Sequence, residues 1–181
     1  ALTSSRPGAD LADIVEKEPV DLVVIEGRRR LIGEGVPPGE VSVLLERAAC
    51  DVAVLVAREE AQIMLGPKHP VLVPFGGAEH DWAALELGSW LAASVGAPLK
   101  LMGAAGQSEE GKSVTRMLAD AGLLVQQATG VAPEPLLVAG GRASIVAAAA
   151  GAGILVIGLS GRWRREGLGP TRAEIARAVP G

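Results

Sequence analysis

The chain has 181 residues, of which 49% are apolar, and it carries 24 glycines, no tyrosine and a formal net charge of −4. Runs of Val, Ile and Leu set among many small residues are typical of α/β proteins, in which helices lie close on a parallel sheet. The acidic balance argues against a nucleic-acid-binding protein, which normally presents a basic face. A single cysteine, Cys50, excludes an internal disulfide and fits a reducing, cytoplasmic compartment. No apolar run approaches the roughly 20 residues of a membrane span.

Strand-like and helix-like segments alternate along the whole chain. Continuous apolar runs of parallel-strand type predict strands at 20–25, 52–57, 71–75, 99–102, 136–138 and 154–157. Apolar residues at helical spacing predict helices at 9–17, 40–49, 81–95, 109–122, 143–150 and 171–178, with Asp81 as the expected N-cap of the third. Serial β-α units require right-handed crossovers, so we predict a doubly wound parallel sheet.

The segment 21–30 recurs at 153–165. Aligning Gly27 with Gly158 gives an offset of 158 − 27 = 131 residues, and Ile14-Val15 then falls on Ile145-Val146. Such an internal repeat indicates tandem units. We expect residues 1–60 to form the C-terminal half of a first unit, 61–70 a linker, and 71–181 a second unit without its last strand. About sixty residues of the first unit would precede Ala1 on this alignment.

The edge of the sheet beside the strand at 154–157 would be bare without a fifth strand, and proteins usually avoid a bare edge. We therefore expect the strand at 52–56 to fill this position within the chain, or a partner chain to do so. This predicts either pairing of the two units or a homodimer.

One stretch matches the phosphate-loop pattern of nucleotide triphosphatases, Gly106-Gln-Ser-Glu-Glu-Gly111-Lys112-Ser113. Its two glutamates would repel phosphate inside the loop, and it follows the second strand of its unit instead of the first. No later strand ends in the Asp that would help to hold Mg²⁺. Two acids also suit the first turn of a helix, so we interpret the stretch as an ordinary helix start.

The order of these segments resembles the universal stress protein family. The residues that carry the resemblance are Val71-Leu-Val-Pro-Phe-Gly-Gly-Ala-Glu-His-Asp81 for its first strand and turn, Gly158-Leu-Ser-Gly161 after its fourth strand, and Ala49-Cys-Asp-Val-Ala-Val-Leu-Val56 for its fifth. The resemblance covers nearly the whole chain. It implies tandem sheets of the adenine nucleotide alpha hydrolase-like type.

Nucleotide-binding members of that family carry an Asp at the end of the first strand and a Gly-x2-Gly-x9-Gly-(Ser/Thr) loop after the fourth. Here Gly76 takes the place of the Asp. In the second unit Gly158 and Gly161 keep their spacing, but Gly169 comes two residues early and Pro170 precedes Thr171. In the first unit Gly27 is kept, Arg30 replaces the second glycine, and an acid follows Gly39. The ATP signature is degraded in both copies.

Arginines cluster beyond the carboxyl ends of both repeated strands, at 28–30 and at 162, 164 and 165. Open α/β sheets bind ligands at that edge, and guanidinium groups suit phosphate oxygens. The alternative is a solvated loop whose arginines pair with Glu34 and Glu166. The candidate nucleotide-binding residues are Gly76, Gly77, Gly158, Ser160, Gly161, Arg162, Arg164, Gly169, Thr171, Gly27, Arg28 and Arg30.

The remaining singular residues point to no catalyst. His80 has no partnered nucleophile nearby in sequence, which favours a histidine in the turn before a helix, and His69 falls in the linker. No cluster of residues has the spacing of metal ligands. Trp163 stands among arginines, where it could contact a partner or a base, or cover the sheet edge.

The resemblance implies a regulatory or sensory domain that is not an enzyme. Relatives of this kind occur as cytosolic parts of transporters, and the segments around Trp82 and Trp163 look most like those of cation/proton antiporters. On that interpretation the domain senses an adenine nucleotide, ATP or AMP, or a cyclic dinucleotide. Two alternatives remain: a soluble tandem protein that binds ATP or AMP, and a ligand-free dimerisation module.

Overall fold

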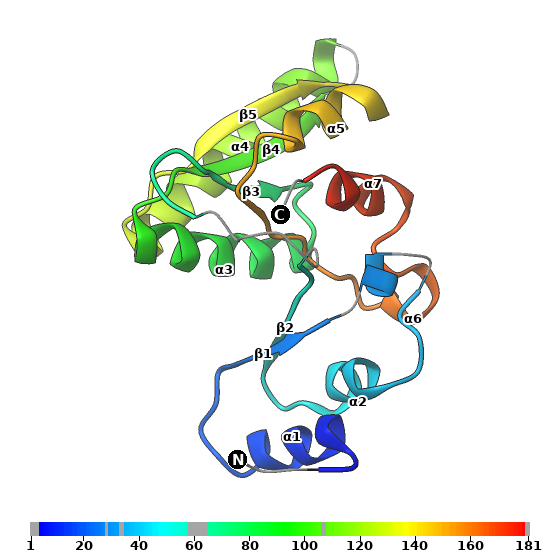
Figure 1. Ribbon diagram of the computed structural model, residues 1–181. Helices are drawn as coiled ribbons and strands as arrows, with labels where there is room; N and C mark the ends of the chain where they lie inside the picture. Colours follow the sequence, from blue (N-terminus) through cyan, green and yellow to red (C-terminus); the bar gives the residue numbers. More distant parts are fainter. Residues whose placement is uncertain (1–3, 28, 33–34, 58–64, 106–107, 180–181) are drawn as a thin grey trace. The chain divides into compact units, whose positions relative to one another are not determined.

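The computed structural model describes residues 4–27, 29–32, 35–57, 65–105 and 108–179 (Figure 1). Its contacts divide the chain into two compact units. Unit 1 comprises residues 1–59 together with 161–169, and unit 2 comprises residues 60–160 together with 170–181. This division differs from the boundary that the sequence predicts, because the segment 161–169 makes its contacts with the first unit.

Unit 1 is a small α/β unit with two parallel strands. Its elements are α1 (Pro7–Val15), β1 (Leu22–Glu26), the 3-10 helix η1 (Arg29–Ile32), α2 (Glu40–Arg47), β2 (Asp51–Leu55) and α6 (Trp163–Glu166). β1 and β2 pair in register from Leu22 opposite Asp51 to Glu26 opposite Leu55. Ala12 and Val15 of α1 and Leu44 of α2 are buried, since these two helices pack on each other.

Unit 2 alternates strands and helices. Its elements are β3 (Val71–Pro74), α3 (Glu79–Val95), β4 (Leu99–Ala105), α4 (Ser108–Thr129), β5 (Glu134–Ala139), α5 (Arg142–Ala149), β6 (Ile154–Leu155) and α7 (Pro170–Ala178). The strands form one parallel sheet in the order β5-β4-β3-β6. The predicted doubly wound parallel sheet is confirmed.

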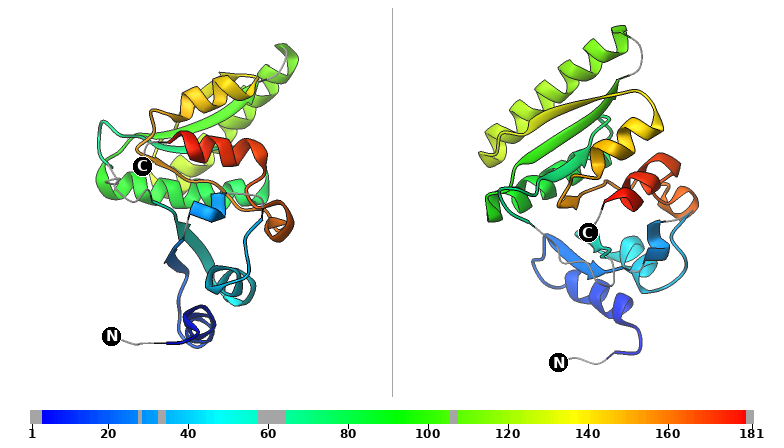
Figure 2. Two further views of the ribbon diagram at one scale, coloured as in Figure 1. Left: turned by 45° about the vertical axis from the view of Figure 1, so that its right-hand side comes forward. Right: turned by 45° about the horizontal axis from the view of Figure 1, so that its top comes forward.

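Helices cover both faces of this sheet, α3 and α4 one face and α5 and α7 the other (Figure 2). Side chains alternate along a strand, so Val71 and Val73 join the first core cluster while Leu72 joins the second. Both faces are apolar, as a buried parallel sheet requires.

α4 runs seven residues beyond its predicted end at Gly122. Leu118, Ala121 and Val125 are buried at helical spacing, which carries the apolar face past the glycine. The packing of this face outweighs the roughly 1 kcal/mol that a glycine costs inside a helix. The other helices that the sequence predicts start and end within two residues of their predicted bounds. η1 and α6 lie in segments that the sequence predicts as loops.

The sequence predicts a further strand beside β6, on the side away from β3. In the described part of the chain β2 has β1 as its sheet neighbour, and β6 pairs with β3. The expectation that residues 52–56 fill the position beside the strand at 154–157 stays a prediction, because pairing with β1 uses only one edge of β2. Filling of this edge by a partner chain stays a prediction.

Candidate functional site

The turn that follows β3 is held by one buried carboxylate. Asp81 is 1% exposed, and its Oδ2 accepts hydrogen bonds from the backbone N–H groups of Gly76, at 2.9 Å, and of Ala78, at 3.2 Å. Asp81 is the third residue of α3, not its N-cap, which is Ala78. It still satisfies one free N–H group at the helix start, that of the N-cap Ala78, because a side chain at this position can reach back to the N-cap.

The second oxygen of Asp81 binds an arginine from a helix far away in sequence. Nη2 of Arg172, in the first turn of α7, donates to Oδ1 of Asp81 at 2.7 Å. Nη1 of the same guanidinium lies 2.8 Å from Nε2 of His80. All three residues belong to unit 2, so α7 is tied to the start of α3 through one arginine.

These contacts fix the protonation pattern of His80. A guanidinium has donors and no acceptor, so Nε2 of His80 must accept the bond and the ring must carry its proton on Nδ1. Nε2 of His80 also lies 3.5 Å from Oδ1 of Asp81. Both atoms are acceptors, and each accepts a hydrogen bond from a different nitrogen of the Arg172 guanidinium.

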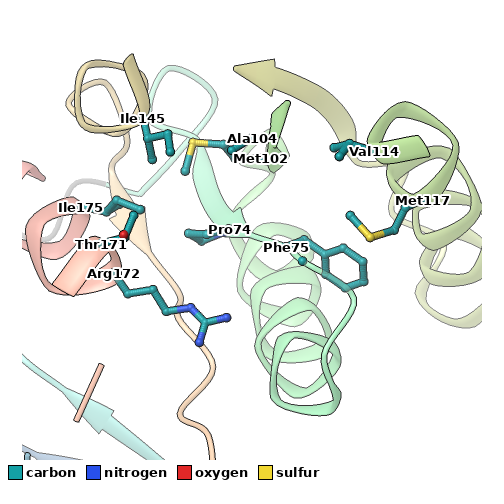
Figure 3. Close-up of a pocket in the computed structure, with 11 residues that line it drawn as sticks. Pro74, Phe75, Met102, Ala104, Val114, Met117, Ile145, Thr171, Arg172 and Ile175 are labelled. Atoms are coloured by element: carbon teal, nitrogen blue, oxygen red, sulfur yellow. The ribbon is translucent and has the colours of Figure 1, made fainter. Parts of the chain in front are cut away.

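A pocket of about 380 Å³ opens at the carboxyl ends of β3 and β4 (Figure 3). Most of its lining is apolar, and the polar contributors are the side chains of Thr171 and Arg172. The residues that line it are Pro74, Phe75, Gly76, Met102, Ala104, Val114, Met117, Ile145, Thr171, Arg172 and Ile175. In an open α/β sheet this is the edge at which ligands bind, near the point where strand order reverses between β3 and β6.

The pocket can hold a flat apolar group and one polar or anionic group. Phe75, Met102 and Met117 offer an aromatic face and two polarizable thioethers, which suit a planar ring. Arg172 offers guanidinium donors that suit an oxygen acceptor. Its charge is already offset by Asp81, which is too deeply buried to reach a ligand.

The predicted residues divide between the two units. Gly76 and Thr171 line the pocket, Gly77 forms the turn beside them with a φ of 83°, and Gly158 and Ser160 follow β6 in the same unit. Gly27 follows β1 and donates its N–H to the Leu55 carbonyl, and Arg30 lies in η1. Arg28 lies outside the described residues. The pocket lining includes none of the predicted residues that unit 1 holds, which are Gly161, Arg162, Arg164, Gly169, Gly27 and Arg30.

Gly158 has a packing role. A Cβ at this position would overlap the carbonyl oxygen of His80 and would lie 3.0 Å from the N atom of Asp81. The chain after β6 therefore runs against the backbone at the start of α3, an approach that only glycine allows.

The arginines of α6 are exposed and paired with acids. Arg162 and Arg165 pair with Glu166, at 3.3 Å and 3.0 Å, and Arg164 pairs with Glu46 of α2. The guanidinium of Arg164 also lies over the Trp163 ring, 5.2 Å from its centroid. The two pairs with Glu166 match the alternative in which loop arginines serve neighbouring glutamates, the pair of Arg164 with Glu46 was not predicted, and Glu34 lies outside the described residues.

The structure also bears on the phosphate-loop pattern. Residues 108–113, six of the eight residues of the pattern, lie in the first turns of α4, where a phosphate loop requires irregular backbone before its Gly-Lys-Ser. Among the described residues no group of three or more His, Cys, Asp and Glu could hold a metal ion. None of the helices found there is long and apolar enough to cross a membrane.

Sequence reasoning missed Arg172, since it singled out arginines in loops. One signal was available. A cation in the first turn of a helix faces the positive end of the helix dipole, so it needs a compensating acid. A buried Asp follows the first strand of the same unit, and it supplies that acid.

The order β5-β4-β3-β6, with helices on both faces and a pocket at the carboxyl edge, defines a doubly wound α/β fold. Comparison with solved structures narrows the fold. A universal stress protein from Archaeoglobus fulgidus DSM 4304 superposes with a TM-score of 0.60 and 14% identity over 96% of this chain and 62% of that one. A putative universal stress protein from Pseudomonas aeruginosa UCBPP-PA14 superposes with a TM-score of 0.51 and 15% identity, over 98% of this chain and 66% of that one.

A universal stress protein in complex with cAMP gives a TM-score of 0.49 and 22% identity over 64% of this chain and 94% of that one. No protein-family model matches the sequence, and no curated protein matches it. The chain has the universal stress protein fold, as its sequence predicts, and it spans about two thirds of the length of the two structures from Archaeoglobus and Pseudomonas.

Proposed function

We propose that this chain is a non-catalytic regulatory domain that binds an adenine nucleoside or nucleotide in the pocket of unit 2. The observation that carries the proposal is the pocket itself, which combines an apolar lining of Phe75, Met102 and Met117 with the single guanidinium of Arg172. Such a lining suits a base, and Arg172 suits an oxygen of the attached sugar or phosphate.

A polyphosphate suits this site poorly. The charge of Arg172 is offset by Asp81, and His80 is neutral while it accepts from Arg172. Gly158, which would begin a phosphate loop, is packed against the His80 carbonyl. The site therefore favours adenosine or a nucleotide with one phosphate over ATP. The offset charge of Arg172 also supports a role in sensing a nucleotide over one in hydrolysing it.

We further propose that this site is coupled to a cation/proton antiporter or to another transporter. A soluble tandem protein is its alternative. A dimerisation module is the second candidate, favoured by the outer edge of β6, which has no strand beside it in the part of the chain that the structure describes. A parallel strand from a second copy would satisfy the N–H and C=O groups of that edge.

Ala104→Phe tests the binding proposal. Ala104 is exposed at the end of β4 and lines the pocket, so a phenyl group there fills the ligand space with little effect on the core. We expect adenosine affinity, measured by calorimetry, to fall at least about tenfold. Wild-type protein should bind ATP no more tightly than adenosine.

The matched control is Ala139→Phe, at the exposed end of the neighbouring strand β5 and outside the pocket. A second control is Arg162→Ala, which removes an arginine paired with Glu166. Both should bind adenosine as the wild type does. No saturable binding of adenosine, AMP, cAMP or ATP by the wild type would refute the proposal, as would equal binding by the Ala104→Phe and Ala139→Phe variants.

A further inference from the structure

We propose that His80 makes anion binding in the unit 2 pocket dependent on pH, through its hydrogen bond with Arg172. The inference rests on the proposed ligand site and adds its regulation. The residues that carry it are His80, Asp81 and Arg172, of which Arg172 lines the pocket.

The bond between Arg172 and His80 exists only while the imidazole is neutral. Nε2 of His80 accepts from Nη1 of Arg172 at 2.8 Å. A proton on Nε2 would bring two cations into contact, because the guanidinium keeps its charge at any physiological pH. The bond must then break.

Protonated His80 has another partner at hand. Oδ1 of Asp81, now bound by Nη2 of Arg172, lies 3.5 Å from Nε2 of His80. A small movement turns this contact into a charged hydrogen bond and releases Arg172 from one or both of its partners. Arg172 is the member of the trio in the pocket lining. Its freed donors and uncompensated charge therefore become available to a bound anion.

The charge around the trio supports this direction. His80 faces Asp81 on its own helix and Arg172 on α7, and Glu79 precedes it at the start of α3. Glu174 of α7 pairs with Arg142. The chain that packs on the His80 carbonyl, residues 158–160, brings no ionisable side chain. One proton on His80 thus changes the net charge of His80, Asp81 and Arg172 from zero to +1.

A pair of ligands with fixed charges tests the proposal. Cyclic AMP keeps one negative charge across the range in which histidine side chains titrate, between about pH 5 and 8, and adenosine keeps none. We expect cAMP to bind roughly threefold to tenfold more tightly at about pH 5.5 than at about pH 8, because a single added charge acts at a partly solvated site. Adenosine should gain much less.

His80→Gln removes the titration and keeps an oxygen that can accept from Arg172. Its cAMP affinity should be flat with pH, whereas His69→Asn, which changes the second of the two histidines, should leave the wild-type profile. Imidazole ¹⁵N shifts give a reading that needs no ligand. At about pH 8 the His80 ring should carry its proton on Nδ1, and His80 is then the acceptor that the account requires.

The outcomes separate this inference from the proposed function. Binding of both ligands with the same flat pH profile overturns the inference and leaves the proposed site standing. A profile that persists in the His80→Gln variant, or an Nε2–H tautomer at about pH 8, also overturns it. Absence of binding by either ligand at any pH overturns both.

Discussion

Replacing Gly158 by alanine is expected to lower the free energy of unfolding by about 3 kcal/mol, at the upper end of what overpacking usually costs. The added Cβ would overlap the carbonyl oxygen of His80, and a backbone atom at a helix start cannot rotate out of the way as a side chain could. The sheet neighbour β6 or the start of α3 must then shift. Urea unfolding followed by circular dichroism measures the effect.

Gly161→Ala is the control for this prediction. Gly161 lies three residues further along the same segment, and a Cβ there meets nothing within 4 Å. Its stability should stay within about 0.5 kcal/mol of the wild type. Equal stability of the two variants would contradict the packing role assigned to Gly158. It would reopen the view that this glycine serves a phosphate loop.

Asp81→Asn is expected to cost about 2 kcal/mol of stability. The amide cannot accept from Arg172 with its NH₂ group while its single oxygen serves the N–H groups of the β3 turn, so a buried partner is left without its bond. Breaking a fully buried pair costs about 3–5 kcal/mol, and the partial exposure of Arg172 reduces that figure. Thermal or urea unfolding gives the measured difference.

The chain offers a matched control in Asp13→Asn. Asp13 pairs with Arg47 at 2.6 Å, and both side chains are about half exposed. Exposed pairs contribute roughly 0–1 kcal/mol, so this variant should lose less than half of what Asp81→Asn loses. If the two losses are equal, the Asp81 contacts do not hold α7 to α3 as described.

The sheet of unit 2 could be predicted because its signals are local. Each strand is an apolar run next to an amphipathic helix, and right-handed crossovers then leave few topologies. The end of α4 could not be predicted from its glycine, since the deciding contribution is the burial of Leu118, Ala121 and Val125 against the sheet.

The pocket lies at the edge of the sheet where the sequence places the candidate site, and the arginine in its lining is Arg172, which the sequence does not single out. Glycine spacing and clustered arginines in a loop are visible in sequence, whereas the contact between Arg172 and Asp81 joins residues 91 positions apart. Arg162 and Arg165 pair with Glu166, which lies close to them in sequence, whereas the buried Asp81 takes its cation from another helix. A buried acid with no cation near it in sequence therefore indicates that a cation from a distant segment pairs with it.

The central claim, that the pocket of unit 2 binds an adenine ligand, is tested most directly by the methionine methyl groups. The chain has three methionines, of which Met102 and Met117 line the pocket, and Met64 lies outside the described residues. With ¹³C-methyl labelling, and assignment by Met→Leu variants, the Met102 and Met117 signals should shift in proportion as adenosine saturates the protein. Saturating adenosine that leaves both pocket signals in place would contradict the account.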